Sequence, residues 1–205
     1  MEERHYFKPG DHRPFLARDP FSAIIGPRPI GWISSLSPSG TANLAPYSFF
    51  NAFNYHPPII GFASVGWKDT VANITETGEF GWNLASEPLA SAMNVTSAAA
   101  GPDIDEFELA GLDKAPAREI AAPLVAQSPV SFECRLTQTL RLETAAGQQV
   151  DTWMVFGEVI GIHLSPEAVV DGSYVTARGR PLLRAGGQGD YFTIDAANRF
   201  IMLRP

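Results

Sequence analysis

The stretch from Arg28 to Asn83 reads RPIGWISSLSPSGTANLAPYSFFNAFNYHPPIIGFASVGWKDTVANITETGEFGWN. Its apolar, β-compatible runs at 30–36 and 59–64 predict two strands. Ser37-Pro38-Ser39-Gly40 is a turn signal after the first run. A run of mixed aromatic and polar residues precedes the second strand. Pro57-Pro58 ends this run, because proline cannot donate a hydrogen bond to a β-ladder. The stretch therefore predicts a region of antiparallel hairpins.

Each predicted strand leads into a loop of small and polar residues. The first loop covers 41–48 and the second covers 64–70. The second opens into a short predicted helix that ends before Gly78, a C-terminal glycine position, with Asp69 or Thr70 as its N-cap. Small residues let a ligand approach the main chain, and a helix start presents free N–H groups. The two loops therefore suit a flat, hydrogen-bonding ring with a phosphate tail.

Further along the chain, residues 130–142 alternate with a period of two and predict a half-buried strand. The inward face takes Val130, Phe132, Cys134 and Leu136, and the other face takes Ser131, Glu133 and Arg135. A returning strand is predicted at 152–164 and a second helix at 87–98. The helices are inserted between strands and do not alternate with them. The fold class predicted is therefore mostly β with inserted short helices, in an antiparallel barrel.

We expect residues 1–20 to form an N-terminal arm and residues 21–205 to form a single domain. Hydrophobic residues make up 45% of the chain and charged residues 18%, which is typical of a globular protein. No apolar run reaches the roughly 18 residues of a membrane span, and the polar N-terminus lacks the apolar segment of a secretory signal. A single cysteine fits a reducing compartment. These features predict a cytoplasmic protein without a membrane partner.

The formal net charge is −7, which argues against nucleic acid as a partner because phosphate neutralisation needs clustered Lys and Arg. The chain has three lysines, and Lys68 stands in the second loop. Together with Ser64, Thr70 and the N–H groups of a helix start, its ammonium makes a candidate anion site. Asp69 is negative and is interpreted as an N-cap or loop brace.

Purely structural interpretations of the same residues, without a ligand, remain open. Trp32, Phe49, Phe50 and Phe53 can cover the faces of a ring or can be barrel core. The loop at Lys68 can be a solvated helix start, and 43–48 can be a turn before a strand. Three such features within one short segment favour a ligand site.

The ordered series of motifs closely resembles the flavin reductase-like, FMN-binding split-barrel family. The similar segments are WISS, GxxNLAPYSFFN, PP before a strand, KDTxxNI and TGEFxxN, followed by FELAGL, APLV, SPVSFECRL, FGEVIGIHL and PLLRxGGxxxY. They cover roughly residues 20 to 195 in the same order. The resemblance implies an antiparallel split β-barrel of FMN-binding type and a homodimer with FMN near its interface.

The resemblance also implies the cofactor contacts. These are Ser34, Ser35, Asn43, Leu44, Ala45, Pro46, Tyr47, Ser48, Ser64, Lys68, Asp69, Thr70 and Asn73, with Arg184 and Tyr191 of the tail completing the pocket, from either subunit. No catalytic side chain and no metal ligand is expected, because a bound flavin performs the chemistry and the protein orients it.

The activity implied is hydride transfer from NADH or NADPH to flavin by an NAD(P)H:flavin oxidoreductase, which can supply a partner monooxygenase. FMN is then a prosthetic group or an exchangeable one. The alternatives are an FMN-containing electron carrier and a split barrel that binds another ligand without redox chemistry.

Other reactive residue types favour structural roles. Cys134 lies on the inward face of its strand and is expected to be a buried thiol. The four histidines lack metal-ligand spacing. His56 is near the proposed site, with contact to a flavin or a nicotinamide as its less favoured role, whereas His163 is expected to be structural. The acidic run 103–106 is expected to be a solvated loop.

Overall fold

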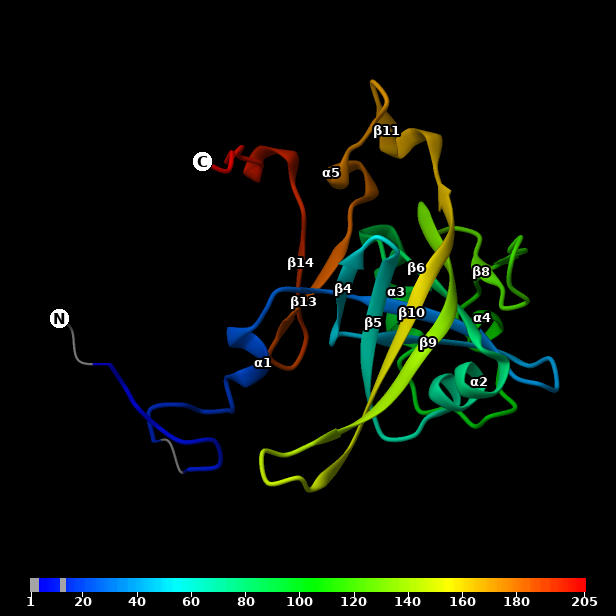
Figure 1. Cartoon of the computed structure of the whole chain (residues 1–205). Helices are drawn as coiled ribbons and strands as arrows, with labels where there is room; N and C mark the ends of the chain where they lie inside the picture. The colour runs from blue at the N-terminus through cyan, green and yellow to red at the C-terminus, as the bar shows by residue number, and fades with distance from the viewer. Residues whose placement is uncertain (1–3, 12–13) are drawn as a thin grey trace.

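The computed structural model describes residues 4–11 and 14–205. A seven-stranded sheet forms the body of the molecule (Figure 1). In sheet order its strands are β3 (Ala42–Tyr47), β2 (Gly31–Leu36), β6 (Glu79–Asn83), β9 (Val130–Glu143), β10 (Gln149–Leu164), β5 (Pro58–Val65) and β4 (Phe50–Tyr55). Every neighbouring pair is antiparallel. The mostly β, antiparallel fold expected from the sequence is therefore confirmed.

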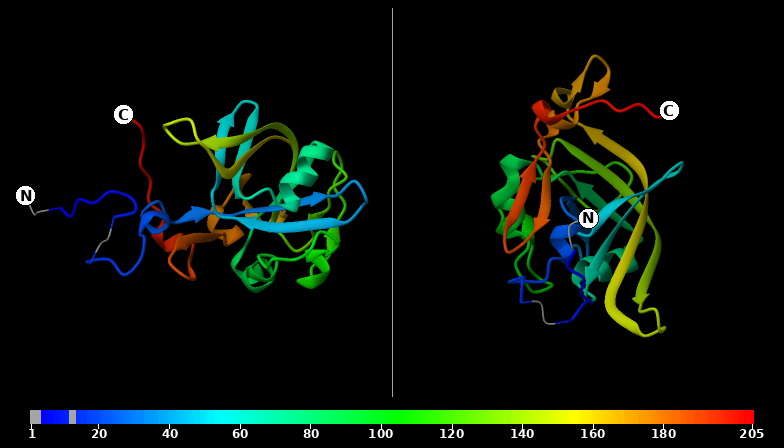
Figure 2. Two further views of the ribbon diagram at one scale, coloured as in Figure 1. Left: turned by 90° about the horizontal axis from the view of Figure 1, so that it is seen from below. Right: turned by 90° about the vertical axis from the view of Figure 1, so that its left-hand side faces the viewer.

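The two ends of the sheet are brought together by a short connection. β3 and β4 lie at opposite ends of the strand order, yet Ser48 and Phe49 alone separate them in the chain. The N–H of Ala63 on β5 donates to the Phe49 carbonyl at 2.8 Å. The sheet thus curls into a barrel that is open along one seam, which is a split barrel (Figure 2). The sequence run 43–55, which mixes apolar and polar residues, is two strands with their junction at that seam.

The barrel interior is filled by apolar side chains from both halves of the sheet. Phe62 on β5 and Phe80 on β6 are fully buried and meet edge to face, with 6.1 Å between ring centroids. Helix α2 (Asp69–Thr77) adds Val71 and Ile74, which are also fully buried. Burying side chains of this size contributes about 1.5–3 kcal/mol each, so this cluster is the main source of stability for the barrel.

The helix α2 ends as its sequence predicts. Gly78 adopts the left-handed conformation, with φ of 77°, and its N–H donates to the Ile74 carbonyl at 2.9 Å. Glycine takes this conformation without the steric cost of a Cβ. The chain then turns at once into β6.

A second apolar cluster lies outside the barrel, between β2–β3 and two short helices. These are α3 (Ala90–Val95) and α4 (Glu106–Leu109), and they bury Trp32, Leu44, Met93 and Phe107. The helix predicted at 87–98 is thus shorter, because a 3₁₀ turn, η1 (Glu87–Leu89), takes its first residues and the helix ends at Val95.

The remaining elements are short and connect or flank the barrel. They are α1 (Phe21–Ile24), β1 (Arg28–Pro29), β7 (Lys114–Ala115), β8 (Leu124–Val125), η2 (Pro166–Ala168), β11 (Val169–Val170), β12 (Ser173–Tyr174), α5 (Thr176–Gly179), β13 (Leu182–Gly186), β14 (Asp190–Thr193) and η3 (Ala196–Asn198). β1, β13 and β14 form a separate three-stranded sheet on the side of the barrel where helix α1 and the C-terminal tail lie (Figure 1).

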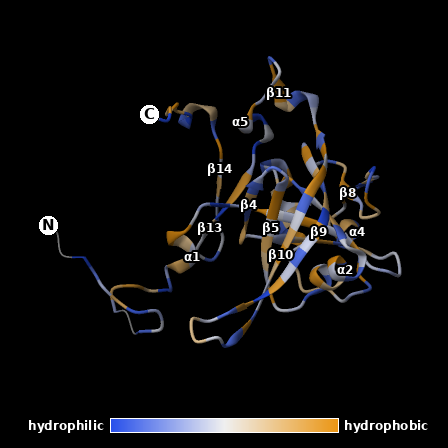
Figure 3. Ribbon diagram, viewed as in Figure 1, coloured by the Kyte–Doolittle hydropathy of each residue, from blue (hydrophilic) through white to orange (hydrophobic). Residues whose placement is uncertain are grey.

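Hydropathy alternates along β9 and β10, as the sequence indicates (Figure 3). The face of β9 predicted to be outward is nevertheless buried near its start, where Ser131 and Glu133 are 3% and 1% exposed. The segment 117–128 covers this face, and non-local cover of this kind leaves no trace in a period-two pattern. Among the described residues, no helix has the length and apolar character needed to cross a membrane.

Candidate functional site

A cavity of about 470 Å³ opens where β3, β5 and the start of α2 meet. From the sequence-predicted residues, its lining contains Asn43, Ala45, Pro46, Tyr47, Ser48, Lys68, Asp69 and Thr70. The two segments singled out in the sequence therefore lie against one space. The prediction of a loop at 41–48 is wrong, because this segment is strand β3. One wall is strand main chain and another is a helix N-terminus, so the cavity can offer hydrogen bonds to a ring and free N–H groups to an anion.

The start of α2 differs from its predicted form. Lys68 is in the N-cap position with an extended backbone, and Asp69 is the first helical residue. No side chain caps the helix, so the prediction of an Asp69 or Thr70 cap is wrong. Thr70 instead accepts a hydrogen bond from the Asn43 side chain, with 2.8 Å between Nδ2 and Oγ1. This bond ties α2 to β3, and the first-turn N–H groups are left without a side-chain cap.

Several predicted contacts lie behind the cavity wall and brace it. Ser34, Ser35, Leu44 and Ser64 are fully buried, and Asn73 is 9% exposed. The Asn73 Nδ2 donates to Ser35 Oγ at 3.3 Å, and Ser64 Oγ donates to the Gly66 carbonyl at 2.9 Å. These five residues do not line the cavity. The first of these bonds ties α2 to β2, and the second lies in the turn that leads to Lys68.

The tail residues Arg184 and Tyr191 also lie outside this cavity lining. They pair across β13 and β14, and the Arg184 guanidinium stands 5.0 Å from the Tyr191 ring centroid. Their link to the cavity runs through Arg28 on β1, which donates from Nε to the Ser48 carbonyl at 2.9 Å. Burial and then the charge of Arg184 lower the pKa of Arg28. The small sheet thus supports the seam from outside.

Tyr47 carries a polar atom that the protein itself leaves unused. Its hydroxyl is buried and close to the hydroxyls of Thr70 and Ser64, but among the described residues it has no partner at hydrogen-bond geometry. Burial is the main reason that the pKa of Tyr47 is raised. Leaving such a group unpaired costs about 1–3 kcal/mol. The fit of the cavity to a hydrogen-bonding ring with an anionic tail rests instead on the main chain of β3, on Lys68 and on the uncapped start of α2.

The cavity also has a wall that the sequence interpretation missed. Residues 96–100 line it, as does Glu106. The run 103–106 is therefore not simply a solvated loop, because Glu106 is only 6% exposed. Its Oε2 accepts the Leu44 N–H at 3.0 Å. The small residues TSAAAG after a helix were the available signal for this wall.

The aromatic residues proposed to cover a ring have different positions. Phe49 lines the cavity. Trp32 is fully buried outside the barrel and donates from Nε1 to Thr96 Oγ1 at 3.0 Å. Phe50 stacks on Trp82, and Phe53 is 55% exposed. Of the four aromatics, Phe49 is therefore the one that lines this cavity.

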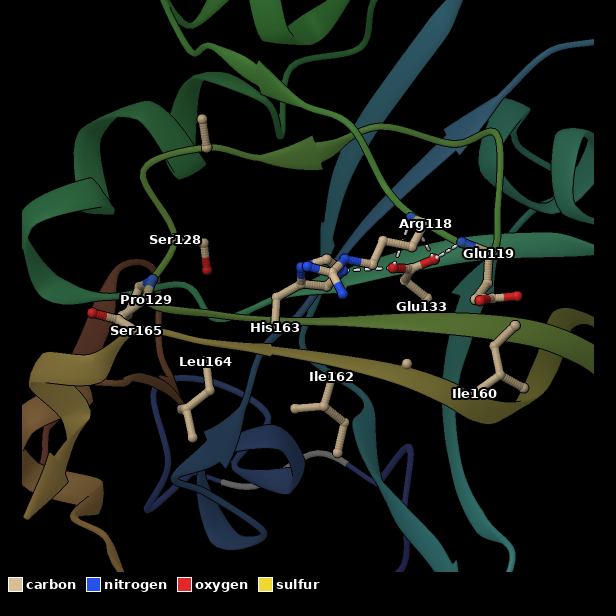
Figure 4. Close-up of a pocket in the computed structure, with 12 residues that line it drawn as sticks. Arg118, Glu119, Ser128, Pro129, Glu133, Ile160, Ile162, His163, Leu164 and Ser165 are labelled. Atoms are coloured by element: carbon tan, nitrogen blue, oxygen red, sulfur yellow. Dashed lines mark hydrogen bonds and ion pairs between the residues drawn. The ribbon is translucent and has the colours of Figure 1, made fainter. Parts of the chain in front are cut away.

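A second cavity, of about 660 Å³, lies between β10 and the segment 118–129 (Figure 4). At its base the Glu133 carboxylate accepts three main-chain N–H groups, from residues 118 to 120, and pairs with His163 Nε2 at 2.5 Å. The side chains of Ile162 and Leu164 point to the side of β10 opposite to that of His163 (Figure 4). The cluster holds the covering segment in place, and His163 has a hydrogen-bond partner, as the prediction of a structural histidine requires.

Comparison with known proteins identifies the class. The fold is an antiparallel split barrel, and residues 26–185 match the flavin reductase-like domain. The chain belongs to this family. An uncharacterised protein of Aquifex aeolicus is 34% identical over 171 residues, which are 80% of this chain and 84% of that protein.

Two solved structures show the likeness in three dimensions. Nitrilotriacetate monooxygenase component B from Bacillus cereus has a TM-score of 0.87 at 26% identity, and the match covers 98% of this chain and 100% of that one. The 2-nitrobenzoate 2-nitroreductase NbaA from Pseudomonas fluorescens has a TM-score of 0.76 at 30% identity, covering 90% of this chain and 88% of that one.

Proposed function

We propose that this protein is an FMN-binding NAD(P)H:flavin oxidoreductase and that FMN occupies the cavity between β3 and α2. The observation that carries the proposal is the meeting of two elements at one space. The main chain of β3 near Tyr47 and the uncapped N-terminus of α2 with Lys68 line the same cavity. Membership of the flavin reductase-like family supports the same conclusion.

Each part of the cavity suits one part of the cofactor. The small residues Ala45 and Pro46 leave β3 open to a flat ring, and Phe49 adds an aromatic surface beside it. Lys68 and the first N–H groups of α2 would hold the phosphate, since a helix N-terminus favours anions. Asn43 and Thr70 keep these two binding elements in register through their hydrogen bond.

FMN held by Lys68 and the main chain of β3 would supply the chemistry of hydride and electron transfer from a reduced nicotinamide to an acceptor. The protein binds the cofactor, orients it and limits the access of water to its faces. No side chain is assigned to proton abstraction, in keeping with a reaction that the cofactor performs.

Assembly and setting belong to the same proposal. We infer a cytoplasmic homodimer, with residues 1–20 as an arm and 21–205 as the domain. Phe200, Ile201, Met202 and Leu203 are 72–85% exposed in the C-terminal tail, and a second copy would cover such apolar side chains. The likeness to a monooxygenase component B supports a role in supplying reduced flavin to a partner oxygenase.

The test is oxidation of NADH or NADPH by the purified protein, followed as loss of nicotinamide absorbance with FMN, FAD or riboflavin added. The proposal predicts flavin-dependent oxidation of at least one nicotinamide. Flavin binding without nicotinamide oxidation would favour the function of an electron carrier over that of a reductase. If the protein neither binds flavin nor oxidises a nicotinamide, the cavity is not a flavin site and another ligand is favoured.

A further inference from the structure

Glu106 places a buried carboxylate on the wall of the proposed cofactor cavity. It is the first residue of α4 and is 6% exposed. One of its oxygens, Oε2, accepts the Leu44 N–H on the neighbouring strand β3 at 3.0 Å. Its side chain belongs to the cavity lining, together with Asp69 and Lys68. A carboxylate is an unexpected group beside the binding site of a phosphate.

The formal charges on this cavity do not favour an anion. Its described lining carries one cation, Lys68, and two carboxylates, Asp69 and Glu106, so its formal charge is −1. A phosphate monoester adds about −1.5 to −2 at neutral pH. The repulsion is relieved if one carboxyl group takes up a proton.

Glu106 is the carboxylate whose burial disfavours a negative charge. Asp69, the first helical residue of α2, is only half-buried. Glu106 is more deeply buried, and burial is the main reason that its pKa is raised. The N–H groups of Leu44 and of Glu106 itself lower this pKa, while the charges of Asp105 and Asp69 raise it further. The titratable groups facing it are Asp69 on α2, Lys68 at the N-cap of α2, Tyr47 on β3, and Asp105 at the N-cap of α4. Asp105 is paired with Lys114.

We propose that Glu106 takes up a proton when FMN binds, so that the affinity for FMN decreases with rising pH. The inference rests on the proposed FMN site. Flavin bound nearby favours the neutral carboxyl group, so affinity is greatest below the pKa of Glu106 in the free protein. Affinity then falls, by up to about tenfold per pH unit, until the pKa of Glu106 in the complex is passed. Above that pKa it is low and constant.

The experiment measures FMN affinity from about pH 6 to pH 8.5, across the upper part of the range that raised carboxyl pKa values reach. Calorimetry in two buffers of different ionisation enthalpy counts the protons taken up. The test variant is Glu106→Gln, which keeps an oxygen to accept the Leu44 N–H. The matched control is Glu108→Gln, since Glu108 is exposed on the same helix. Comparison with wild type cancels the ionisation of the FMN phosphate itself.

We expect wild type and Glu108→Gln to take up protons and to lose at least about threefold in affinity per pH unit over part of this range. Glu106→Gln should take up fewer protons and bind FMN more tightly than wild type at the alkaline end. Equal proton counts and equal pH slopes in wild type and Glu106→Gln would overturn the inference and leave the FMN site standing. Failure of wild type to bind FMN at any pH would instead refute the proposed function.

A second measurement does not depend on the variant. Riboflavin has the same ring without the phosphate, so its binding to wild-type protein should take up fewer protons than FMN binding at the alkaline end. Equal uptake with both flavins would contradict a role for phosphate repulsion, and the inference with it.

Discussion

Replacing Lys68 with alanine removes the ammonium group from the N-cap of α2 and should weaken FMN binding. The side chain is exposed at the cavity rim, so its interaction with phosphate is screened by water. A unit charge pair about 4 Å apart is worth about 1 kcal/mol in water, and the phosphate charge is roughly twice that. Exposure reduces the contribution further. We therefore expect a loss of about 1–2 kcal/mol, or about 5–30-fold in Kd.

The assay is titration of flavin fluorescence with wild type, Lys68→Ala and a control, Lys8→Ala, which changes an exposed lysine of the N-terminal segment. Titration at low salt and again at about 1 M salt, where the Debye length is about 3 Å, separates charge from packing. The difference between wild type and Lys68→Ala should shrink in high salt. Equal affinities at low salt, in folded proteins, would place the phosphate away from Lys68.

Three further changes test the wall, the core and the second cavity. Asn43→Ala removes the hydrogen bond to Thr70. It should lower the free energy of unfolding by about 1 kcal/mol and weaken FMN binding. Reduced stability with unchanged FMN affinity would show that Asn43 only holds β3 and α2 together. Gly157→Ala places a Cβ against the Phe80 ring and should lower the free energy of unfolding, measured with denaturant, by about 1–3 kcal/mol. A decrease below about 0.5 kcal/mol would show that the ring can move aside. Glu133→Gln should lower the free energy of unfolding by about 2–4 kcal/mol, because a buried carboxylate loses hydrogen bonds from N–H donors. Thermal melts near neutral pH check this prediction, and an unchanged Tm would contradict it.

The same carboxylate gives a pH prediction. Burial raises the pKa of Glu133, but hydrogen bonds from His163 and the main chain outweigh burial and lower it overall. A lowered pKa gives stability that is present above the ordinary carboxyl value and is lost as pH falls through the lowered pKa. Wild type should therefore lose stability on acidification below about pH 4.5, and Glu133→Gln should lose less. Parallel acid-unfolding curves for the two proteins would contradict this.

Local sequence signals anticipated the strands β2, β5, β9 and β10, the helix α2 and its glycine end, but not the strand β3, whose residues were predicted to form a loop. The alternation in 130–142 correctly predicts β9 and a buried Cys134, because a period of two depends on neighbouring residues alone. The burial of Glu133 could not be predicted in this way. It depends on a segment some fifteen residues earlier that folds over β9 and donates its N–H groups to the carboxylate.

The site was predictable to the extent that its residues follow one another in the chain. Asn43–Ser48 and Lys68–Thr70 each form a continuous motif, and the structure places residues of both motifs on one cavity. The wall of residues 96–100 and Glu106 has no motif, and it reaches the cavity only through the packing of α3 and α4 on β3. The division between Ser35, which braces the wall, and Ser48, which lines the cavity, likewise depends on which strand face each residue occupies.

The central claim, that FMN occupies this cavity and accepts electrons from a nicotinamide, is tested most directly by absorption spectroscopy. The protein is mixed with FMN, desalted and titrated anaerobically with NADH and then NADPH. The account predicts retained bands near about 370 and 450 nm, from general flavin chemistry, that bleach with at least one nicotinamide. The absence of retained flavin, together with no nicotinamide oxidation when flavin is in excess, would contradict it.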